Sequence, residues 1–195
     1  SGSGYSKLNI SLLSNSDYTD NSVVNGTMYY YVVTATDALS NESGHSVEAC
    51  AVPDSNDNII LQENATGFCS VDGIIDTQHA GYTGSGFCDT ENAIGTGINW
   101  SVNILTGGTY TLTWRYAHGK TDDRSARLLV NGSEVVSSIA FPPTGAFTTW
   151  STVSVDISLT AGVKTIRLEG ITINGLANID YINVAGESLM TAGCP

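Results

Sequence analysis

Apolar and polar residues alternate along most of the chain after residue 58, and this pattern predicts β-strands. The alternating apolar series are Ile98-Trp100-Val102-Ile104, Tyr110-Leu112-Trp114-Tyr116, Leu128-Val130, Val153-Val155-Ile157-Leu159, Ile166-Leu168 and Ile179-Tyr181. The pairs Gly107-Gly108, Asn131-Gly132 and Ala161-Gly162 separate them and predict tight turns. No segment keeps a 3.6-residue period, so we expect almost no helix. The pattern predicts an all-β fold, a β-sandwich jelly roll with Trp100 and Trp114 in its core.

The residues before position 53 form a separate strand-like block. Large side chains fill both alternating sets from Tyr29 to Ala35, as expected for the central strand of a sandwich. Asn25-Gly26 precedes this strand and predicts a turn. We therefore expect one domain over 1–52, a second over 59–186 and a C-terminal tail over 187–195. The polar residues 53–58, which are rich in turn formers, predict the linker.

Charge excludes several classes of partner. The 195-residue chain has a formal net charge of −12 and a pI of about 4.3. Nucleic acid binding needs clustered Lys and Arg, and attraction to an anionic membrane needs the same. No apolar run approaches the length of a membrane span, so we expect no membrane partner; any secretion signal is expected upstream of the first residue.

The four cysteines indicate an oxidising compartment. Cys50, Cys69, Cys88 and Cys194 are widely spaced, without the short C-x-x-C spacing of zinc or redox sites. Of the three possible pairings, we expect Cys69–Cys88 and Cys50–Cys194. Four buried free thiols are the alternative.

Three segments carry candidate ligand-binding residues. Tyr82 lies among three glycines in residues 79–87, where a large ring is poorly placed for the core and well placed to meet a ligand. Trp150 follows the loop 142–149, just before a predicted strand, and Asn178 precedes the strand of Ile179. Sugars stack their C–H faces on aromatic rings and exchange hydrogen bonds with amides. The alternative for Tyr82 is a ring that covers an edge of the core.

Basic residues gather in one stretch. Four of the seven, Arg115, Lys120, Arg124 and Arg127, lie between positions 115 and 127. Such a cluster could receive a ligand carboxylate. Pairing with Asp122 and Asp123 explains it equally well.

Carboxylates at both ends of the second domain suggest a calcium site. Gln62 and Glu63 lie on an early predicted strand and Asp180 on the last one, and first and last strands of a sandwich are often neighbours. Asp72 and Asp76 precede the tyrosine loop and could hold a second ion. Surface carboxylates without metal are the alternative in both places.

Several stretches in order resemble a known family. They are Gln62-Glu63-Asn64-Ala65, the segment 79–87, Trp114-Arg115-Tyr116-Ala117-His118-Gly119, Phe141-Pro142-Pro143-Thr144-Gly145 with Thr149-Trp150, and Asn178-Ile179-Asp180-Tyr181. Over residues 59–185 the chain resembles a family 35 carbohydrate-binding module, a relative of family 6.

The resemblance implies a jelly roll with a structural calcium at Glu63 and Asp180. The family usually has two acidic residues in its first strand, where this chain has Gln62 and Glu63. The sugar site of the family maps onto loops at one end of the fold. In this chain that site comprises Tyr82, Trp150 and Asn178, with Arg115, His118, Asp123 and Arg124 nearby. Some members bind uronic acids, some of them through a second calcium, and others bind neutral mannans or galactans.

The N-terminal block resembles the last strands of a fibronectin type III domain, with Tyr29 as the corner tyrosine. Together the two resemblances imply a secreted bacterial enzyme that contains a non-catalytic, monomeric binding module. The module is expected to target an appended lyase or glycoside hydrolase domain to plant or algal polysaccharide of pectin or alginate type. A spacer or adhesive module with a protein partner is the alternative. The chain has three histidines but neither a G-x-S-x-G nor an H-E-x-x-H motif, so we do not expect an enzyme.

Overall fold

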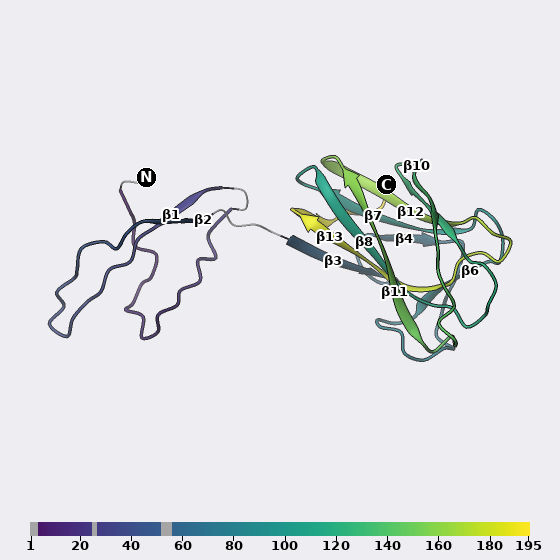
Figure 1. Cartoon of the computed structure of the whole chain (residues 1–195), viewed down its shortest axis with the longest axis horizontal. Helices are drawn as coiled ribbons and strands as arrows, with labels where there is room; N and C mark the ends of the chain where they lie inside the picture. Colours follow the sequence, from purple (N-terminus) through teal and green to yellow (C-terminus); the bar gives the residue numbers. More distant parts are fainter. Residues whose placement is uncertain (1–3, 25–26, 52–55) are drawn as a thin grey trace. The chain divides into compact units, whose positions relative to one another are not determined.

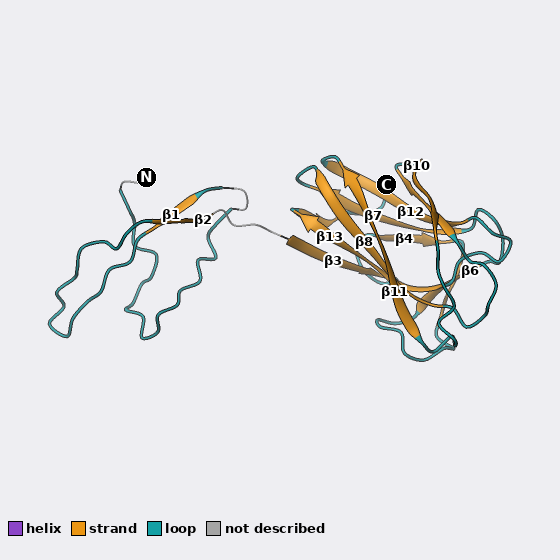
Figure 2. Cartoon of the chain, in the orientation of Figure 1, coloured by secondary structure: helices purple, strands orange, loops and turns teal. Residues whose placement is uncertain are grey.

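The computed structural model describes residues 4–24, 27–51 and 56–195, and the chain divides into two compact units, Ser1–Ser55 and Asn56–Pro195. The expected turn Asn25-Gly26 and part of the expected linker 53–58 lie outside the described residues. Within the described residues the regular elements are all strands, which confirms the all-β prediction (Figure 2). None of these residues forms a helix with the length and apolarity needed to cross a membrane.

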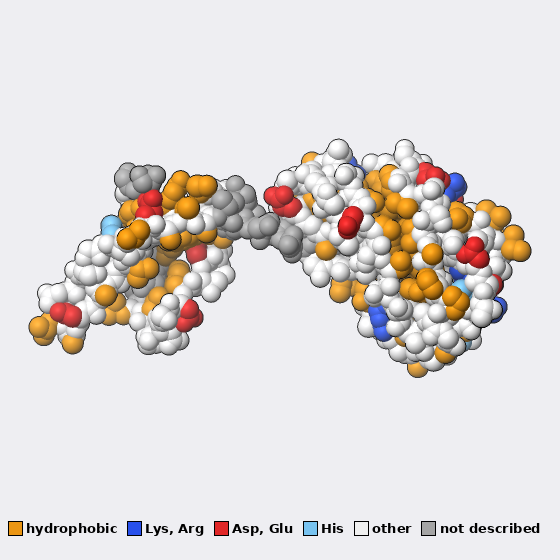
Figure 3. All heavy atoms as spheres, viewed as in Figure 1, with side chains coloured by type: hydrophobic (Ala, Val, Ile, Leu, Met, Phe, Trp, Pro, Cys, Tyr) orange, Lys and Arg blue, Asp and Glu red, His pale blue; other side chains and the backbone are white. Residues whose placement is uncertain are grey.

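The N-terminal unit has little regular structure. Its strands β1 (Tyr29–Tyr31) and β2 (Ala49–Ala51) form a short antiparallel pair. The strand predicted to run to Ala35 ends early, and the side chain of Val33 is 70% exposed rather than buried. In the space-filling view, apolar side chains are spread over the surface of this unit (Figure 3). Two three-residue strands cannot cover a core, and the fibronectin type III resemblance stays a prediction.

The second unit contains the remaining strands. These are β3 (Asn56–Gln62), β4 (Phe68–Val71), β5 (Gly73–Asp76), β6 (Phe87–Thr90), β7 (Gly97–Ile104), β8 (Gly108–Ala117), β9 (Ala126–Val130), β10 (Ser133–Ile139), β11 (Trp150–Leu159), β12 (Gly162–Gly170), β13 (Asn178–Glu187) and β14 (Leu189–Thr191). They form two antiparallel sheets (Figure 1). The β7 sheet has the order β10-β9-β12-β7-β14, with β4 also paired to β7. The β8 sheet has the order β11-β8-β13-β6-β5, with β3 also paired to β13.

The core lies between these two sheets, as a β-sandwich requires. Alternate side chains of β7 and β8 face inward, and Trp100 and Trp114 are 1% and 0% exposed. Both tryptophans therefore occupy the core positions that the alternation predicts. The predicted turn at Asn131-Gly132 joins β9 to β10 with positive φ at both residues, 51° and 77°, as a two-residue hairpin loop demands.

The C-terminal residues belong to the sandwich and do not form the separate tail that we predicted for 187–195. Strand β13 extends to Glu187, and β14 then pairs with β7 through Leu189↔Ile104. Strand β4 pairs with the other end of β7, through Val71↔Ile98. The two short strands therefore lie along β7, and the segments that carry Cys69 and Cys194 meet there.

The structure corrects the predicted disulfides. Cys69 is bonded to Cys194, and Cys50 and Cys88 are free thiols. Cys88 lies on β6 and packs within the core cluster, where it is 2% exposed and keeps a free thiol. Cys50 lies in the other unit and is exposed. The pairing depends on the placement of β4 and β14 beside β7, which spacing along the sequence does not reveal.

We expect Cys194→Ser to lower the free energy of unfolding by about 2–5 kcal/mol, because the bridge closes a loop with a sequence separation of 125 residues and so restricts the unfolded chain. Urea denaturation of the full chain under oxidising conditions, followed at the transition of the second unit, measures this change. Cys50→Ser is the matched control and should leave the transition unchanged. Equal stability of both variants and the parent chain would contradict the structural role of the bridge.

Candidate functional site

Sheet register places Trp150 and Asn178 at the same end of the β8 sheet. Trp150, the first residue of β11, is paired with Ala117 of β8, and Ala117 is paired on its other side with Asn178 of β13. Directly paired residues point to the same face of a sheet, and two strand spacings amount to about 10 Å. The indole and the amide therefore project from the same face of the sheet, and one sugar residue with its neighbour can span the distance between them.

Asn178 has unused hydrogen-bonding capacity. Asn178 is only 5% exposed, but the nitrogen and oxygen of its amide are not sealed from solvent, and within residues 4–24, 27–51 and 56–195 they have no hydrogen-bond partner. An unpaired amide beside a half-exposed indole is therefore available to a polar ligand.

A cluster of rings forms the floor beside this row. Phe87 is fully buried, and its ring centroid lies 5.9 Å from that of Tyr82 and 5.6 Å from that of Trp150. His79 stacks on Phe87 at 6.0 Å and on Phe147 at 4.9 Å. Phe87 thus brings Tyr82 and Trp150 to one side of the fold, although the two are 68 positions apart in the sequence.

The indole of Trp150 is held in place from two directions. Its Nε1–H donates to the carbonyl of Ala80 at 3.1 Å, and the guanidinium of Arg115 lies 5.1 Å from its ring centroid. Gly81 lets the loop approach this closely, because a Cβ there would lie 3.0 Å from the indole, and its φ of 96° also favours glycine. One edge and one face of the indole are therefore fixed by protein contacts.

Arg115 joins the β8 sheet to the loop that carries Tyr82. It forms an ion pair with Asp180 and donates from Nη2 to the carbonyl of Gly81 at 2.9 Å. Asp180 also accepts hydrogen bonds from the backbone N–H and the hydroxyl of Thr83 at 2.9 and 3.0 Å. Burial raises the pKa of Asp180, and the contacts with Arg115 and Thr83 partly offset that rise. Arg115 is thus engaged by protein groups, and its partner is Asp180 rather than Asp122 or Asp123.

Glu63 holds the same loop from the other side. Its Oε1 accepts from the backbone N–H of Ser85 and of Gly86 at 2.5 and 2.9 Å. A Cβ on Gly84 would lie 2.1 Å from Gln62 Oε1 and 2.8 Å from Glu63 Oε1, so both oxygens crowd against this turn. Glu63 Oε2 is buried and has no hydrogen-bond partner. An unpaired, buried carboxylate oxygen is costly and suits a hard cation.

The oxygens near this loop are of the types that calcium accepts. Gln62 is the last residue of β3, Glu63 begins the turn after it, Asp180 lies in β13, and β3 and β13 are adjacent through Tyr181↔Gln62. Among the described residues no group of three or more His, Cys, Asp and Glu side chains is arranged as a metal site. Calcium also accepts amide and backbone carbonyl oxygens, so two carboxylates and the Gln62 amide remain a suitable donor set.

Two of the expected sugar-site residues instead support the scaffold. His118 is fully buried between the carbonyl of Phe141 at 3.0 Å and Asp122 Oδ1 at 3.1 Å. Arg124 is 6% exposed and donates from Nη1 to the carbonyl of Leu176 at 2.6 Å. Because Leu176 lies two residues before Asn178, this bond fixes the segment that leads to the free amide.

The other candidate carboxylates have local partners. Asp123 accepts from the backbone N–H and hydroxyl of Ser125 at 2.9 and 2.6 Å. Asp72 pairs with Arg167 at 2.6 Å, whereas Asp76 accepts from the backbone N–H of Gln78 at 3.1 Å. Asp72 and Asp76 therefore do not share a ligand cage, which leaves the expected second ion without support in the described residues.

Of the four clustered basic residues, three are paired. Arg115 pairs with Asp180, Arg124 with Asp122 at 3.3 Å, and Arg127 with Glu169 at 2.5 Å. Lys120 is exposed and has no ion pair within the part of the chain that the structure describes. It lies in the loop that begins next to Ala117, and it is therefore the basic residue of this cluster that is available to an anionic ligand.

Sequence reasoning did not single out Phe87, His79 and Phe147 as site residues. Phe87 and His79 flank the glycine-rich loop, and Phe147 lies in the loop before Trp150. Each looks like an ordinary loop or strand residue, because its role depends on how two loops pack together. Their position between the two predicted binding segments is the one signal that could have drawn attention to them.

A β-sandwich that presents aromatic rings and a free amide at one end has the architecture of a carbohydrate-binding module. A model described as "Carbohydrate binding module (family 6)" matches residues 65–186, and the chain belongs to this family. The family 35 module of Cellvibrio japonicus Abf62 is 41% identical, covers 71% of this chain and 100% of its own, and superposes with a TM-score of 0.69. The predicted resemblance to family 35 is therefore confirmed.

Two further relatives bear on function. A structure described as Xyl-CBM35 in complex with a glucuronic acid containing disaccharide is 42% identical, covers 70% of this chain and 99% of its own, and has a TM-score of 0.68. Endo-1,4-beta-xylanase B of Cellvibrio japonicus is 42% identical over 137 residues, which are 70% of this chain and 23% of that protein. The chain thus matches about a quarter of this enzyme, and the matching part is a non-catalytic binding module.

The reactivity of the two free thiols tests whether Cys88, in the core behind Phe87, is buried in the native protein. Burial, with smaller effects of Glu63 and Asp180, raises the pKa of Cys88 to about 12, whereas Cys50 is exposed. We expect a thiol reagent at pH 8 to modify Cys50 in the native protein and Cys88 only after denaturation. Cys50→Ser should show no reactive thiol until it unfolds. Rapid native labelling of Cys88 in that variant would contradict the packing behind Phe87.

Proposed function

We propose that the second unit binds polysaccharide through a contact surface made by Tyr82, Trp150 and Asn178. The observation that carries this proposal is the Asn178 amide, which reaches solvent, has no protein partner within the described residues and lies in the same sheet row as Trp150. The rings offer stacking faces for sugar C–H groups, and the amide reads hydroxyls. Affinity should be micromolar to millimolar, about −4 to −8 kcal/mol, because the surface is shallow.

The ligand that we propose is a uronic-acid-containing plant or algal polysaccharide. Two observations support an anionic sugar: the similar Xyl-CBM35 structure contains a disaccharide with glucuronic acid, and Lys120 is exposed without an ion pair in the described region. The net charge of −12 opposes any anion, so the local cation must offset a repulsive background. Pectin and alginate remain candidates beside glucuronoxylan.

In the parent protein the module would hold an attached polysaccharide-degrading enzyme near its substrate. Binding of this kind raises the effective concentration of the catalytic domain without contributing chemistry. The Cys69–Cys194 disulfide supports secretion, because such bonds persist in oxidising compartments. We propose a secreted bacterial protein whose module acts as a monomer.

Calcium would be held by Glu63, Asp180 and the Gln62 amide oxygen. Bound there, the ion supplies charge neutralisation and oxygen coordination. The residues themselves already fasten the loop of Tyr82: Asp180 through Thr83, and Glu63 through Ser85 and Gly86. Calcium in this position therefore stabilises the loop that carries one wall of the sugar site.

Removal of either ring should abolish most binding. We expect Trp150→Ala and Tyr82→Ala each to weaken affinity for a glucuronic-acid-bearing xylo-oligosaccharide by more than about tenfold, or 1.4 kcal/mol, in isothermal titration calorimetry. The matched control is Tyr30→Ala, which removes a partly exposed ring from the other unit. A second titration with unsubstituted xylo-oligosaccharide separates recognition of the uronate from that of the neutral backbone. If both folded variants bind as tightly as the parent chain, this surface is not the site.

Calcium should raise the thermal stability of the chain. A ligand that binds the folded state alone contributes about 2.7 kcal/mol at a concentration of 100 Kd, and Tm rises accordingly. Differential scanning calorimetry in excess calcium and in excess chelator measures the effect. Glu63→Gln should lose the response, while Asp76→Asn, whose parent carboxylate bonds Gln78 instead, should keep it. Identical Tm values of the parent chain in calcium and chelator would remove the ion from this account.

A further inference from the structure

Arg115 contacts both a candidate calcium ligand and a wall of the proposed sugar site. Its guanidinium pairs with the carboxylate of Asp180, whose side chain is 0% exposed. The same guanidinium lies 5.1 Å from the ring centroid of Trp150 and donates to the carbonyl of Gly81. The cation site and the ring cluster therefore share one basic side chain.

Thr83 connects Asp180 to the other candidate calcium ligands. Its hydroxyl donates to Asp180 Oδ2 at 3.0 Å and accepts from Gln62 Nε2 at 2.7 Å. Two residues further along the loop, the backbone N–H of Ser85 donates to Glu63 Oε1 at 2.5 Å. Gln62, Glu63 and Asp180 thus hold one short loop, and Arg115 reaches this group of side chains from β8.

The negative charges of this group exceed the positive charge that Arg115 supplies. Glu63 and Asp180 are both carboxylates, and within the described residues Glu63 forms no ion pair. Glu63 Oε2 is buried without a hydrogen-bond partner, which is costly for a charged oxygen. The group can therefore accept a further cation beside Arg115, or a stronger one in its place.

The Asp180 carboxylate has little capacity for a second cation while Arg115 occupies it. Its Oδ1 accepts from the backbone N–H of Thr83, and its Oδ2 accepts from the Thr83 hydroxyl and from Arg115. If the same carboxylate coordinates calcium, the guanidinium has a doubly charged neighbour, and repulsion within a partly buried group is weakly screened. Arg115 is the side chain that can move away, because it is 22% exposed whereas Asp180 is 0% exposed.

We propose that Arg115 competes with calcium for Asp180 and thereby couples the cation site to sugar recognition. Without calcium, Asp180 neutralises the guanidinium beside Trp150. With calcium bound, the positive charge of Arg115 is no longer compensated and attracts the carboxylate of a uronic acid. Calcium therefore favours acidic sugars over neutral ones. The identity of the sugar rests on the proposed function, but the competition for Asp180 can be measured without any sugar.

Isothermal titration calorimetry of the full chain with calcium chloride, in the absence of sugar, tests the competition. Arg115→Met should raise calcium affinity by at least about tenfold, because it removes a competing cation. Arg115→Gln should raise it as well, and its amide can still donate to the carbonyl of Gly81. A supporting role for Arg115 predicts the opposite sign, since the loss of its contacts would loosen the loop. An unchanged or lower calcium affinity of Arg115→Gln refutes the competition, as does a parent chain that binds no calcium.

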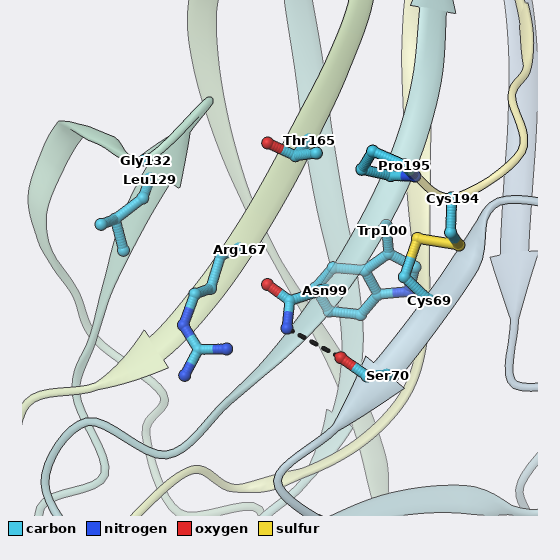
Figure 4. Close-up of a pocket in the computed structure, with 10 residues that line it drawn as sticks. All are labelled: Cys69, Ser70, Asn99, Trp100, Leu129, Gly132, Thr165, Arg167, Cys194 and Pro195. Atoms are coloured by element: carbon cyan, nitrogen blue, oxygen red, sulfur yellow. Dashed lines mark hydrogen bonds between the residues drawn. A yellow bond between two sulfur atoms is a disulfide. The ribbon is translucent and has the colours of Figure 1, made fainter.

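Arg167→Met is the matched control for these variants. Arg167 is also 22% exposed, and it pairs with the carboxylates of Asp72 and Glu169. It lies on β12 and lines a groove of the β7 sheet (Figure 4), whereas Arg115 belongs to the β8 sheet. Its removal changes the net charge by the same amount, so its calcium affinity should equal that of the parent chain. A rise as large as that of Arg115→Gln would assign the effect to net charge and refute competition at Asp180.

Sugar titrations test the coupling. In excess calcium, the parent chain should bind a glucuronic-acid-bearing xylo-oligosaccharide about fivefold or more tightly than in excess chelator, an ordinary size for coupling between two sites. Unsubstituted xylo-oligosaccharide should bind equally in both conditions. In Arg115→Gln, the effect of calcium on uronate affinity should disappear, whereas an ion that bridges protein and ligand directly would preserve it.

The outcomes separate this inference from the proposed function. If the parent chain binds the uronate equally with calcium and with chelator, or if Arg115→Gln keeps the full calcium effect, the coupling is refuted while the sugar site at Trp150 stands. An equal gain for the neutral ligand also refutes it. If the parent chain binds neither sugar, the proposed function fails, and the calcium titrations alone decide whether Arg115 competes for Asp180.

Discussion

The contact surface depends on the register of three strands. Trp150, Ala117 and Asn178 share a row because β11, β8 and β13 pair in one fixed alignment. A slip of one residue in either ladder would turn the indole or the amide to the opposite face of the sheet. The alternating apolar side chains of these strands prevent that slip, since it would move residues such as Trp114 out of the core. Core packing and ligand recognition are therefore set by the same alignment.

The contact surface also requires that the loop that carries Tyr82 keep a fixed position beside Trp150 and Asn178. Asp180 and Glu63 hold residues 83–86 by direct hydrogen bonds, and Arg115 joins that loop to the sheet and to the indole. These contacts fix Tyr82 and Trp150 before any ligand arrives. A preformed surface loses little conformational entropy on binding, so more of the contact energy contributes to affinity.

The sequence allowed most of the sandwich to be predicted. Alternation placed Trp100 and Trp114 in the core, and Asn131-Gly132 marked a hairpin correctly, because both signals are local. The disulfides could not be predicted in this way. Cys69 meets Cys194 because β4 and β14 lie along the same strand, whereas Cys88 is a free thiol within the core cluster. Pairing between distant segments leaves no mark on the spacing of the cysteines.

Among the ion pairs too, the local ones could be predicted from the sequence and the long-range ones could not. Sequence proximity suggested Asp122 and Asp123 as partners for the basic cluster, and this holds for Arg124 with Asp122. Arg115 instead pairs with Asp180, 65 positions away, because β8 and β13 are adjacent in the sheet. Burial likewise decides that His118 supports the fold rather than touching solvent. Candidate residues can be found by type and position, but their division into contacts and supports requires the tertiary arrangement.

Fluorine NMR of the chain labelled with 5-fluorotryptophan tests the central claim most directly, because the chain has three tryptophans and only Trp150 is outside the core. Saturation with a glucuronic-acid-bearing xylo-oligosaccharide should move the resonance of Trp150 and leave those of Trp100 and Trp114 in place. Tight binding of that ligand with an unmoved Trp150 resonance would contradict the account.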